Sequence, residues 1–576
     1  MDGAILYDIK ENRYPKVYVI SAEHACNIES FIRTRGFNIF TTIILEDVLI
    51  IYYDELKNTA EKDIYLKVTA PEGKRIDIKA DNYIDTLYDT QSVMAVYYTK
   101  NGEQEYESLG WINGEKMYYS IPAGVTVHEL KYRETGYDTA FAGDFTCENG
   151  DLNTLWQKSL RTLYVTMRDN FMDCPDRERA QWWGDVTSEM MMSAYALDPD
   201  AYLLYQKGVA CMLGHTDPET KILQTVVPIS GEFFELPVQQ LAGICGFWTY
   251  YLYTGDRAFL ESVYGPALDY VNLWRIGENG LAEHRKGSWD WMDWGQFEDA
   301  PAIENAWYYY ALSCLQSMAA VLGEDAADVT QRMERLRAGY ASFWTERGYK
   351  SGKALFPDDR ANALAVLSGL ATPEQYGVIA SVLKKTKHAS PYMEYYVLEA
   401  LCKMGEFAAA KERMLQRYSG MIRSADSTLW EFWMRAFGTR NHAWSGGPLA
   451  IMSKYFAGIA PTGAGWESFE VRPQPDVCET LDCTVPTVKG YIRLRLNTTA
   501  EGLTLETDVP AQTAAVIYIP CAAGDTVKCG GSVLWQNGVF TPAEGLGFVS
   551  VENGTVAVEI KAETDKTLRF SIMRNS

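Results

Sequence analysis

The sequence predicts a multidomain α plus β protein in which two β-rich segments flank a helical one. Its 576 residues are too many for one hydrophobic core, since single cores stop growing at about 250 to 300 residues. Short runs of alternating apolar residues fill both ends, whereas apolar residues recur every three or four positions in the middle. We therefore expect domains at 1–145, 146–462 and 463–576.

Strands are predicted at both ends, where β-branched and aromatic residues alternate between Gly, Asn and Pro turns. The N-terminal runs are Val48–Tyr53, Ile64–Val68, Arg75–Ile78 and Val93–Tyr98. The C-terminal runs are Ser468–Pro473, Gly490–Leu496 and Ala515–Pro520. Each set is typical of a β-sandwich, and we expect the C-terminal one to be a structural cap without catalytic residues.

Helical spacing covers most of the middle segment. The expected helices lie at 151–168, 186–213, 236–253, 258–275, 302–323, 326–345, 359–368, 373–384, 391–403, 406–416 and 442–457. Paired helices of this kind can close into a ring of hairpins or stack into an α-solenoid. No fixed-period repeat decides between these two arrangements.

The composition excludes several functions. The 53 Lys plus Arg against 76 Asp plus Glu give a net charge of −23, which repels nucleic acid and anionic membranes. The 11 Cys form no Cys-x-x-Cys pair and no zinc spacing, so we predict reduced or buried thiols, no metal and no cofactor. No apolar run reaches the ~18 residues of a membrane span, and no signal peptide is visible. We expect a cytoplasmic protein, or a secreted one given without its leader.

The strongest candidate for chemistry is the run Asn170–Asp185, which connects two helical patterns. Pro175 cannot continue a helix, so the chain turns there. The run contains four carboxylates, two guanidinium groups and two indoles: Asp173, Asp176, Glu178, Asp185, Arg177, Arg179, Trp182 and Trp183. Carboxylates act as general acids, general bases or hydroxyl acceptors, and indole faces line sugar sites. From composition alone, an exposed capping segment with ion pairs is the favoured alternative.

Two further connections combine acidic and aromatic side chains. Trp289, Asp290 and Trp294 suit a sugar subsite, and a Trp-rich lid packed on itself is an equal alternative. The segment Glu232–Glu235 is either a second wall of the same cleft or, as composition favours, an acidic helix cap.

A third stretch, Asp426–Trp433, places Glu431 between two aromatic residues. This apolar setting is expected to raise the pKa of the Glu431 carboxyl. The segment Arg440–Gly447 follows and contains His442. The alternative is a solvent-facing glutamate on a short helix and a histidine that caps a helix.

The run at 173–185 resembles the hallmark of bacterial α-L-rhamnosidases, glycoside hydrolase family 78. The matching residues are Asp173, Cys174, Pro175, Arg177, Glu178, Arg179, Trp182, Gly184 and Asp185. The commoner family form has one more residue between the Arg and the Glu, and a Gly at the position of Gln181. Thr428–Trp433 and Asn441–His442 resemble the family's Thr-x-Trp-Glu-x-Trp motif and the Asn-His after it. Two motifs thus occur in family order.

This resemblance implies a central (α/α)6 barrel flanked by N-terminal and C-terminal β-sandwich domains. It also implies an inverting exo-α-L-rhamnosidase or a closely related glycosidase, with Glu178 as general acid and Glu431 as general base. The residues expected to bind substrate are Asp173, Arg177, Trp182, Asp185, Trp289, Asp290, Trp294, Trp430 and His442. The two carboxyl groups of an inverting pair stand roughly 6.5 to 9.5 Å apart.

The two arginines beside Glu178 conflict with an acid role, because a nearby cation lowers a carboxyl pKa that a general acid needs raised. If the turn is helical, Arg177 and Arg179 can instead pair with Asp173 or Asp176. Two other functions stay open: a different glycosidase or lyase on the same barrel, and a non-catalytic carbohydrate-binding protein. The expected partner is a carbohydrate. The oligomeric state is open, with a dimer as one option.

Overall fold

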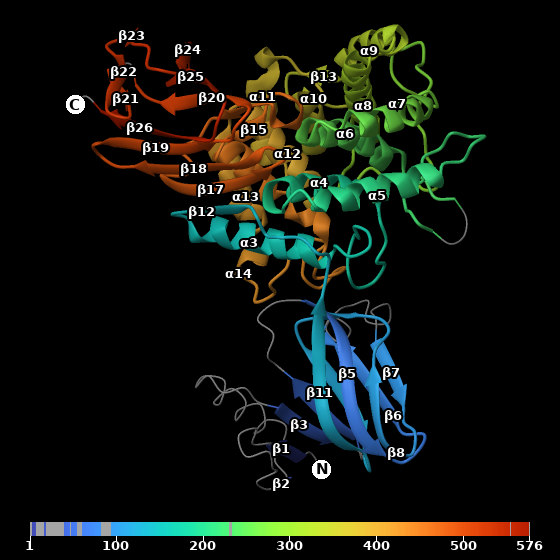
Figure 1. The fold of residues 1–576 in the computed structure, drawn as a ribbon. Coiled ribbons are helices and arrows are strands. Elements are labelled where there is room, and N and C mark those ends of the chain that lie inside the picture. The colour runs from blue at the N-terminus through green and yellow to red at the C-terminus, as the bar shows by residue number, and fades with distance from the viewer. Residues whose placement is uncertain are drawn as a thin grey trace.

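The structure is a computed structural model that describes residues 3–6, 17–18, 40–45, 48–53, 60–81, 94–229, 233–522, 524–552 and 554–574. The N-terminal strands form one body, and strand β11 leads from it to the helices (Figure 1). The C-terminal strands lie against the helices on the side away from α7 and α9. The predicted order of β-rich, helical and β-rich segments is confirmed.

The N-terminal strands form two sheets. The larger has the order β2-β1-β3-β4-β10-β6-β7, and in the smaller β5 pairs with β11, β8 and β9. Their bounds are β1 Gly3–Leu6, β2 Val17–Tyr18, β3 Phe40–Leu45, β4 Val48–Tyr53, β5 Ala60–Ala70, β6 Arg75–Ala80, β7 Met94–Tyr98, β8 Gly102–Glu107, β9 Ile112–Gly114, β10 Met117–Pro122 and β11 Thr126–Thr135. Ile64 and Leu66 of β5 share a buried core with Ile76 and Ile78 of β6, so the two sheets bury a common face.

The helices are α3 Gly150–Val165, α4 Trp183–Ala196, α5 Ala201–Gly214, α6 Pro237–Thr254, α7 Arg257–Val271, α8 Ala300–Leu322, α9 Ala327–Tyr340, α10 Asp359–Leu367, α11 Tyr376–Lys385, α12 Pro391–Lys403, α13 Phe407–Arg417, α14 Ser419–Arg423 and α15 Pro448–Ile451. Helices α4, α6, α8, α10 and α12 contact one another in this order, and α12 and α4 both contact segment 443–451. This contact closes a ring, and α3, α5, α7, α9, α11 and α13 each contact ring members. In the described part of the chain, no helix is long and apolar enough to cross a membrane.

Three predicted helices are wrong in extent. The expected helix at 186–213 is two helices, because Pro199 lacks an N–H and Leu197 is extended, with φ −115° and ψ 160°. The expected helix at 326–345 ends at Tyr340, where a 3-10 turn and a short strand follow. The expected helix at 442–457 is a 3-10 turn, a single α-turn that begins at Pro448, and a π-helical turn.

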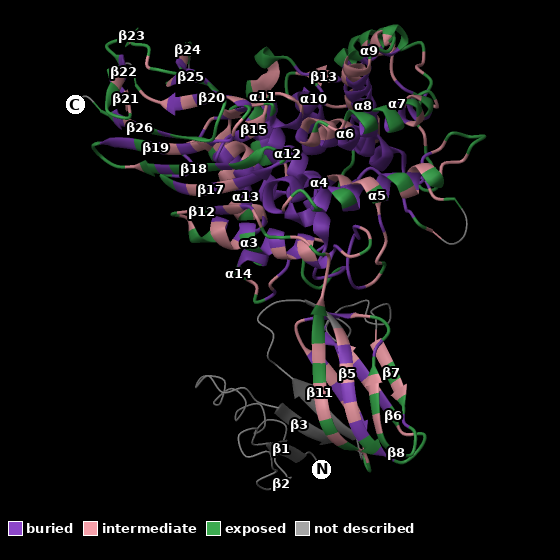
Figure 2. Cartoon of the chain, viewed as in Figure 1, coloured by how far each residue is buried: buried purple, intermediate pink, exposed green. Residues whose placement is uncertain are grey.

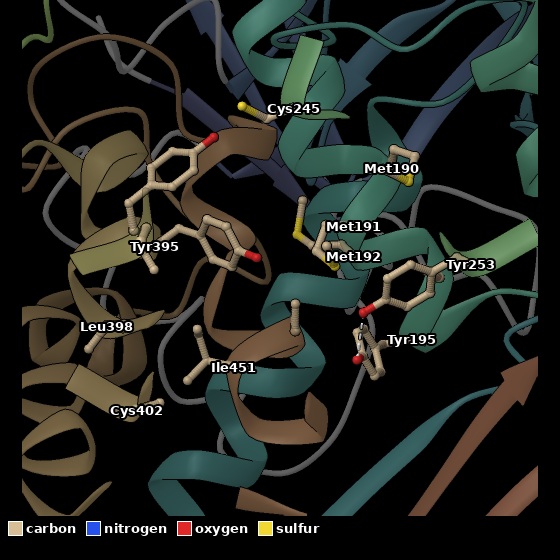
Figure 3. Packing of buried hydrophobic residues seen from close by; sticks show 14 of the residues in the cluster. Met190, Met191, Met192, Tyr195, Cys245, Tyr253, Tyr395, Leu398, Cys402 and Ile451 are labelled. Atoms are coloured by element: carbon tan, nitrogen blue, oxygen red, sulfur yellow. Dashed lines mark hydrogen bonds between the residues drawn. The ribbon is translucent and has the colours of Figure 1, made fainter. Parts of the chain in front are cut away.

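The ring encloses the largest core of the molecule, and its helices are buried along much of their length (Figure 2). Figure 3 shows part of this core, in which Met191 and Met192 of α4 lie between Tyr395 of α12 and Tyr253 of α6. The hydroxyls of Tyr195 and Tyr253 are 2.8 Å apart and hydrogen-bonded. The ten cysteines in the described part of the chain are free thiols, as predicted.

The C-terminal strands form a sheet with the order β12-β17-β18-β19-β26-β21-β22-β23 and a second with the order β15-β16-β20-β25-β24. Their bounds are β12 Asp144–Cys147, β15 Ile459–Pro461, β16 Ser468–Val471, β17 Thr480–Thr487, β18 Gly490–Thr498, β19 Gly502–Val509, β20 Thr513–Pro520, β21 Thr526–Cys529, β22 Ser532–Gln536, β23 Val539–Phe540, β24 Leu546–Glu552, β25 Thr555–Ala562 and β26 Lys566–Met573. Strand β12 precedes the helices yet pairs with β17. The expected boundary between residues 145 and 146 therefore falls inside a strand of the C-terminal sheet.

Candidate active site

The first motif, residues 173–185, begins with an irregular turn that connects α3 to α4, where a helical turn was expected. Two hydrogen bonds join Asp173, near the start of the turn, to Ala180, near its end. The Asp173 N–H donates to Ala180 O at 2.9 Å, and Asp173 Oδ1 accepts from Ala180 N at 3.0 Å. Arg179 has φ +52°, in the left-handed region that a non-glycine residue rarely adopts. The expectation of a helical turn is therefore wrong, and the turn presents each side chain in a direction set by these contacts.

Glu178 lies at the end of this turn with 35% of its side chain exposed. Its Oε1 accepts from Arg177 Nη2 at 2.8 Å, and its Oε2 accepts from Trp182 Nε1 at 2.7 Å. Arg177 also donates to Glu431 Oε1 at 3.2 Å. The expected pairing of Arg177 with Asp173 or Asp176 is replaced by a bridge between the two glutamates.

The guanidinium of Arg177, which both glutamates contact, sets an upper limit on the distance between the two carboxylates. Because one nitrogen lies 2.8 Å from Glu178 Oε1 and 3.2 Å from Glu431 Oε1, these oxygens are at most 6.0 Å apart. Each carboxyl carbon lies about 1.2 Å beyond its oxygen, so the carbons are separated by at most about 8.4 Å. The two groups therefore lie close enough to contact one bound molecule.

Glu431 is buried, with 4% of its side chain exposed. Its Oε2 accepts from Thr439 N at 2.8 Å and from Thr439 Oγ1 at 3.2 Å. Burial acts to raise the pKa of this carboxyl, but His442, Arg177 and the Thr439 N–H together lower it below the usual value. The expectation that an apolar setting raises the pKa of Glu431 is wrong, because His442, Arg177 and Thr439 place positive charge and hydrogen-bond donors beside the carboxylate.

His442 connects Glu431 to the first motif. Its Nε2 lies 3.0 Å from Asp185 Oδ1 at the start of α4, and its Nδ1 lies 3.7 Å from Glu431 Oε2. Burial acts to lower the pKa of His442, yet Glu431 and Asp185 raise it to about 9. Burial raises the pKa of Asp185 in spite of this hydrogen bond. The imidazole is therefore a cation at neutral pH that both carboxylates share.

Aromatic rings line the open side of the site. The rings of Trp182 and Trp289 have centroids 6.3 Å apart, and Phe234 packs edge-on against both, at 5.4 and 5.1 Å. Trp294 lies next to Trp289, with centroids 6.3 Å apart. Trp289 and Trp294 are 40% and 51% exposed, so their faces are available to a ligand.

These groups surround a cavity of about 400 Å³. It is lined by Asp173, Arg177, Glu178, Trp182, Asp185, Leu236, Gln239, Trp289, Trp291, Trp294, Glu431, His442 and Trp444. Nine of these thirteen residues are among the eleven site residues expected from the sequence. Two motifs that are 250 residues apart in the chain thus meet at one cavity.

Two expected site residues do not line the cavity. Asp290 has 55% of its side chain exposed and lies 3.4 Å from His284. Trp430 is buried and donates through Nε1 to Asp426 at 2.8 Å. Neither position could be assigned from the sequence, because each lies beside a cavity residue in the chain and points another way.

Four lining residues were not expected: Leu236, Gln239, Trp291 and Trp444. Trp291 lies between the expected residues Asp290 and Trp294, and Trp444 lies in the segment Arg440–Gly447. Only their place in the cavity wall was not predicted. Leu236 and Gln239 lie at the start of α6, and nothing in their local sequence indicates a site. Glu232 lies outside the described residues, and the buried Glu235 binds Tyr270 and Arg285.

Asp173, Cys174 and His442 offer ligand atoms within 4.8 Å of one another, the spacing of a metal site. His442 is protonated at neutral pH, however, and its Nε2 binds Asp185. Burial raises the pKa of the Cys174 thiol well above its usual value. A metal would therefore have to displace a proton from two of the three donors, which weakens its binding at neutral pH. The absence of a metal from the reaction stays a prediction.

Comparison with known proteins identifies the family. The family model described as bacterial alpha-L-rhamnosidase 6 hairpin glycosidase domain matches residues 140–456, and that of the bacterial alpha-L-rhamnosidase C-terminal domain matches residues 458–533. An alpha-L-rhamnosidase of Formosa agariphila is 22% identical over 422 residues, which are 66% of this chain and 44% of that protein. The chain therefore spans less than half the length of this relative.

Two solved structures share the fold. The GH78 family rhamnosidase of Bacillus sp. GL1 has a TM-score of 0.72 and 24% identity, with 79% of this chain and 52% of that one covered. The Streptomyces avermitilis alpha-L-rhamnosidase complexed with L-rhamnose has a TM-score of 0.74 and 18% identity, with 92% and 52% covered. The first family model matches more than half of the residues of this chain, and the chain therefore belongs to the bacterial α-L-rhamnosidase family of glycoside hydrolases.

Proposed function

We propose that the protein is an inverting exo-glycosidase that removes a terminal α-L-rhamnose, or a closely related sugar, from a glycoside. One observation carries the proposal. Glu178 and Glu431 come from separate motifs and converge on Arg177 in a cavity with indole walls. Glycoside hydrolysis needs two such carboxyl groups across the scissile bond.

Glu178 is assigned as the general acid and Glu431 as the general base. Glu431 suits a base because its lowered pKa keeps it ionised at neutral pH. Glu178 is the more exposed of the two, so it can meet a leaving group that points out of the cavity. In the reaction Glu178 gives its proton to the glycosidic oxygen as the bond from carbon 1 to that oxygen breaks. A water molecule attacks carbon 1 from the other face and gives a proton to Glu431, so that the α-linked sugar leaves as the β anomer.

The cavity walls offer groups for the sugar hydroxyls. Asp173 Oδ2 and Trp291 Nε1 are buried polar atoms of residues that line the cavity, and they have no hydrogen-bond partner among the described residues. Buried polar atoms are nearly always paired, so these two suit the hydroxyls of a bound sugar. The solved relative with L-rhamnose supports a deoxyhexose as the ligand.

The proposal includes the architecture. The closed ring of helices and the outer helices that contact it support an (α/α)6 barrel, and the two pairs of sheets support β-sandwiches on either side. The site lies where α4 and α6 begin, so residues on several ring members reach one cavity. Residues 1–145, 146–462 and 463–576 are the proposed domains, with β12 added to the C-terminal sheet.

A panel of aryl glycosides tests the function, with the α-L-rhamnoside first. Wild-type enzyme should release the aryl alcohol. On a rhamnoside with a poor leaving group, Glu178→Gln and Glu431→Gln should each lower kcat at least 100-fold. Proton NMR of the first product should show the β anomer. Retention of configuration would refute inversion, and hydrolysis of a different glycoside in preference to the rhamnoside would refute the substrate. Tight sugar binding without turnover would instead identify a binding protein.

A further inference from the structure

An edge of the N-terminal domain contacts both of the loops that carry the two glutamates. This N-terminal edge consists of Asp81, which follows β6, together with Trp111, Asn113 and Glu115 in and around β9. None of these four residues lines the cavity. Their contacts nevertheless reach residues that are adjacent in sequence to groups of the active site.

The first contact is with the turn that presents Glu178. The guanidinium of Arg179 stacks on the Trp111 indole, 3.3 Å from the ring centroid. Arg179 also donates through Nη2 to Trp111 O at 2.9 Å and through Nε to Pro175 O at 3.0 Å. Its left-handed backbone, with φ +52°, costs energy unless the surroundings hold it in place. Trp111 holds Arg179 in place, and Arg179 directly follows Glu178 in the chain.

The second contact is with the segment that carries Glu431 and His442. Asn113 Nδ2 donates to Asn441 Oδ1 at 3.2 Å between buried side chains, and Asn441 directly precedes His442. Glu115 Oε1 accepts from Ser427 N at 2.8 Å and from Ser427 Oγ at 2.9 Å. The same edge of the N-terminal domain therefore holds both active-site loops.

Charges between the two loops strengthen this junction. Asp81 lies 3.7 Å from Arg440, one residue before Asn441. Asp176 is buried in the turn, and burial raises its pKa to about 7, with Arg179 and Arg440 acting to lower it and Asp81 to raise it. Of these charges, Asp81 and Arg440 form the pair that joins the N-terminal domain to a loop, so movement of the domain would break this buried pair. The junction thus favours a single relative position of the two loops.

We propose that Trp111 is a positioning residue for the general acid: its stack on Arg179 fixes the turn that aims Glu178, so the N-terminal domain controls the chemical step without touching the sugar. This inference rests on the proposed function of Glu178. Misplacement of a catalytic group by about 1 Å can lower a rate about 100-fold. A purely structural role for Trp111 would instead lower stability and leave the kinetics of the folded enzyme unchanged.

The test compares Trp111→Ala and Trp111→Phe with wild type on two aryl α-L-rhamnosides, one with an acidic leaving group and one with a poor leaving group. The poor leaving group needs protonation by Glu178, whereas the acidic one does not. Trp111→Ala should lower kcat 10-fold to 100-fold on the poor leaving group and less than threefold on the acidic one, with KM changed less than threefold. Trp111→Phe keeps an aromatic face and should recover most of the loss.

Two controls separate this role from general destabilisation. Arg179→Lys keeps the charge but loses the planar stack, and it should show the same dependence on the leaving group. Tyr97→Ala removes a ring that stacks on Tyr106, with centroids 4.7 Å apart, in the N-terminal domain away from the junction. It should lower stability without that dependence. An equal loss on both substrates, or a Tyr97→Ala profile like that of Trp111→Ala, would overturn the inference.

Amide hydrogen exchange in the turn at 174–180 gives a readout that needs no turnover. Exchange should be faster in Trp111→Ala than in wild type and close to wild type in Tyr97→Ala. If the wild-type enzyme hydrolyses no glycoside, the proposed function fails while the exchange result still tests the positioning of the turn. Unchanged exchange in Trp111→Ala would refute the positioning role whether or not the enzyme is active.

Discussion

Replacement of Asp185 by Asn should lower the pKa of His442. The Asn side chain has nearly the same shape, and its oxygen can still accept from His442 Nε2 at the 3.0 Å position of Asp185 Oδ1. The substitution therefore removes a negative charge and little else. Because an anion close to an imidazole favours its protonated form, the loss of that charge favours the neutral form.

The expected magnitude follows from the balance at His442. The rise of its pKa from 6.5 to about 9 corresponds to about 3 kcal/mol, since one pKa unit is about 1.4 kcal/mol. Burial opposes this rise, and Glu431, Asp185 and Asp173 produce it together. Removal of one of these three charges should lower the pKa by about 1 unit, to near 8. Glu431→Gln should also lower it, because the charge of Glu431 is the largest single cause of the rise.

Histidine titration by NMR measures the effect directly. The chain has only 6 His, so a His442→Gln variant identifies the signal of His442 in a protein labelled with nitrogen-15 at histidine. A pKa that stays near 9 in Asp185→Asn would refute the assignment of His442 as a cation shared by Asp185 and Glu431. A fall toward 8 would support it.

The same shift predicts how stability depends on pH. The pKa of His442 is higher in the folded state than the ordinary value of 6.5. Its contribution to the free energy of unfolding is thus fully present below pH 6.5 and is lost as pH rises through 9. In Asp185→Asn this contribution should be lost at a pH about one unit lower than in the wild type. Urea unfolding of the two proteins between pH 6 and 10 measures the difference, and identical pH profiles would contradict it.

Three further substitutions test other parts of the site and its support. Arg177→Met should raise the pKa of Glu431, because it removes a cation that lowers it, so the acidic limb of the pH profile of kcat/KM should move to higher pH. Arg177→Lys should move it less. Trp182→Phe removes the indole N–H that donates to the general acid at 2.7 Å, and it should lower kcat about tenfold with little change in KM. Gly243→Ala would place a Cβ 2.1 Å from the buried indole that begins α4, so it should destabilise by about 1 to 3 kcal/mol, whereas Gly265→Ala in α7 meets no atom within 4 Å and should not. An unmoved acidic limb, an unchanged kcat or equal melting temperatures, respectively, would contradict these predictions.

Local sequence carried enough information for most of the elements. The expected helix at 391–403 coincides with α12, because Ser390 caps it, Pro391 begins it, and apolar residues continue at helical spacing. The expected helix at 186–213 failed because apolar periodicity continues across Pro199, and periodicity alone does not show where the chain turns. The sequence thus predicts the order of the segments, but it does not predict where a helix within a segment is interrupted.

The site was predictable in its members but not in its contacts. The two motifs supplied both glutamates and most of the cavity wall. The bridge from Arg177 to Glu431 joins residues 254 positions apart, and the pairing of Asn113 with Asn441 joins residues 328 apart. Contacts over such separations depend on how whole domains pack, which a local pattern does not contain. The pKa of Glu431 was predicted in the wrong direction because Arg177 is distant in sequence, and because a local pattern does not show that the nearby His442 lies next to this carboxylate.

The bridge by Arg177 bears on how the proposed reaction proceeds. Before the step, Glu431 is ionised and Glu178 holds the proton for the leaving group. After the step, Glu178 is ionised and Glu431 holds a proton from water. The guanidinium contacts an oxygen of each, at 2.8 and 3.2 Å, so it faces one anionic carboxylate at both stages. Arg177 therefore does not favour reactant over product. The other contacts act at different stages: the Thr439 N–H and His442 stabilise ionised Glu431 before the step, whereas the Trp182 N–H and solvent stabilise ionised Glu178 after it. The two stages are thus distinguished by the second partners of the two glutamates and not by the cation that they share.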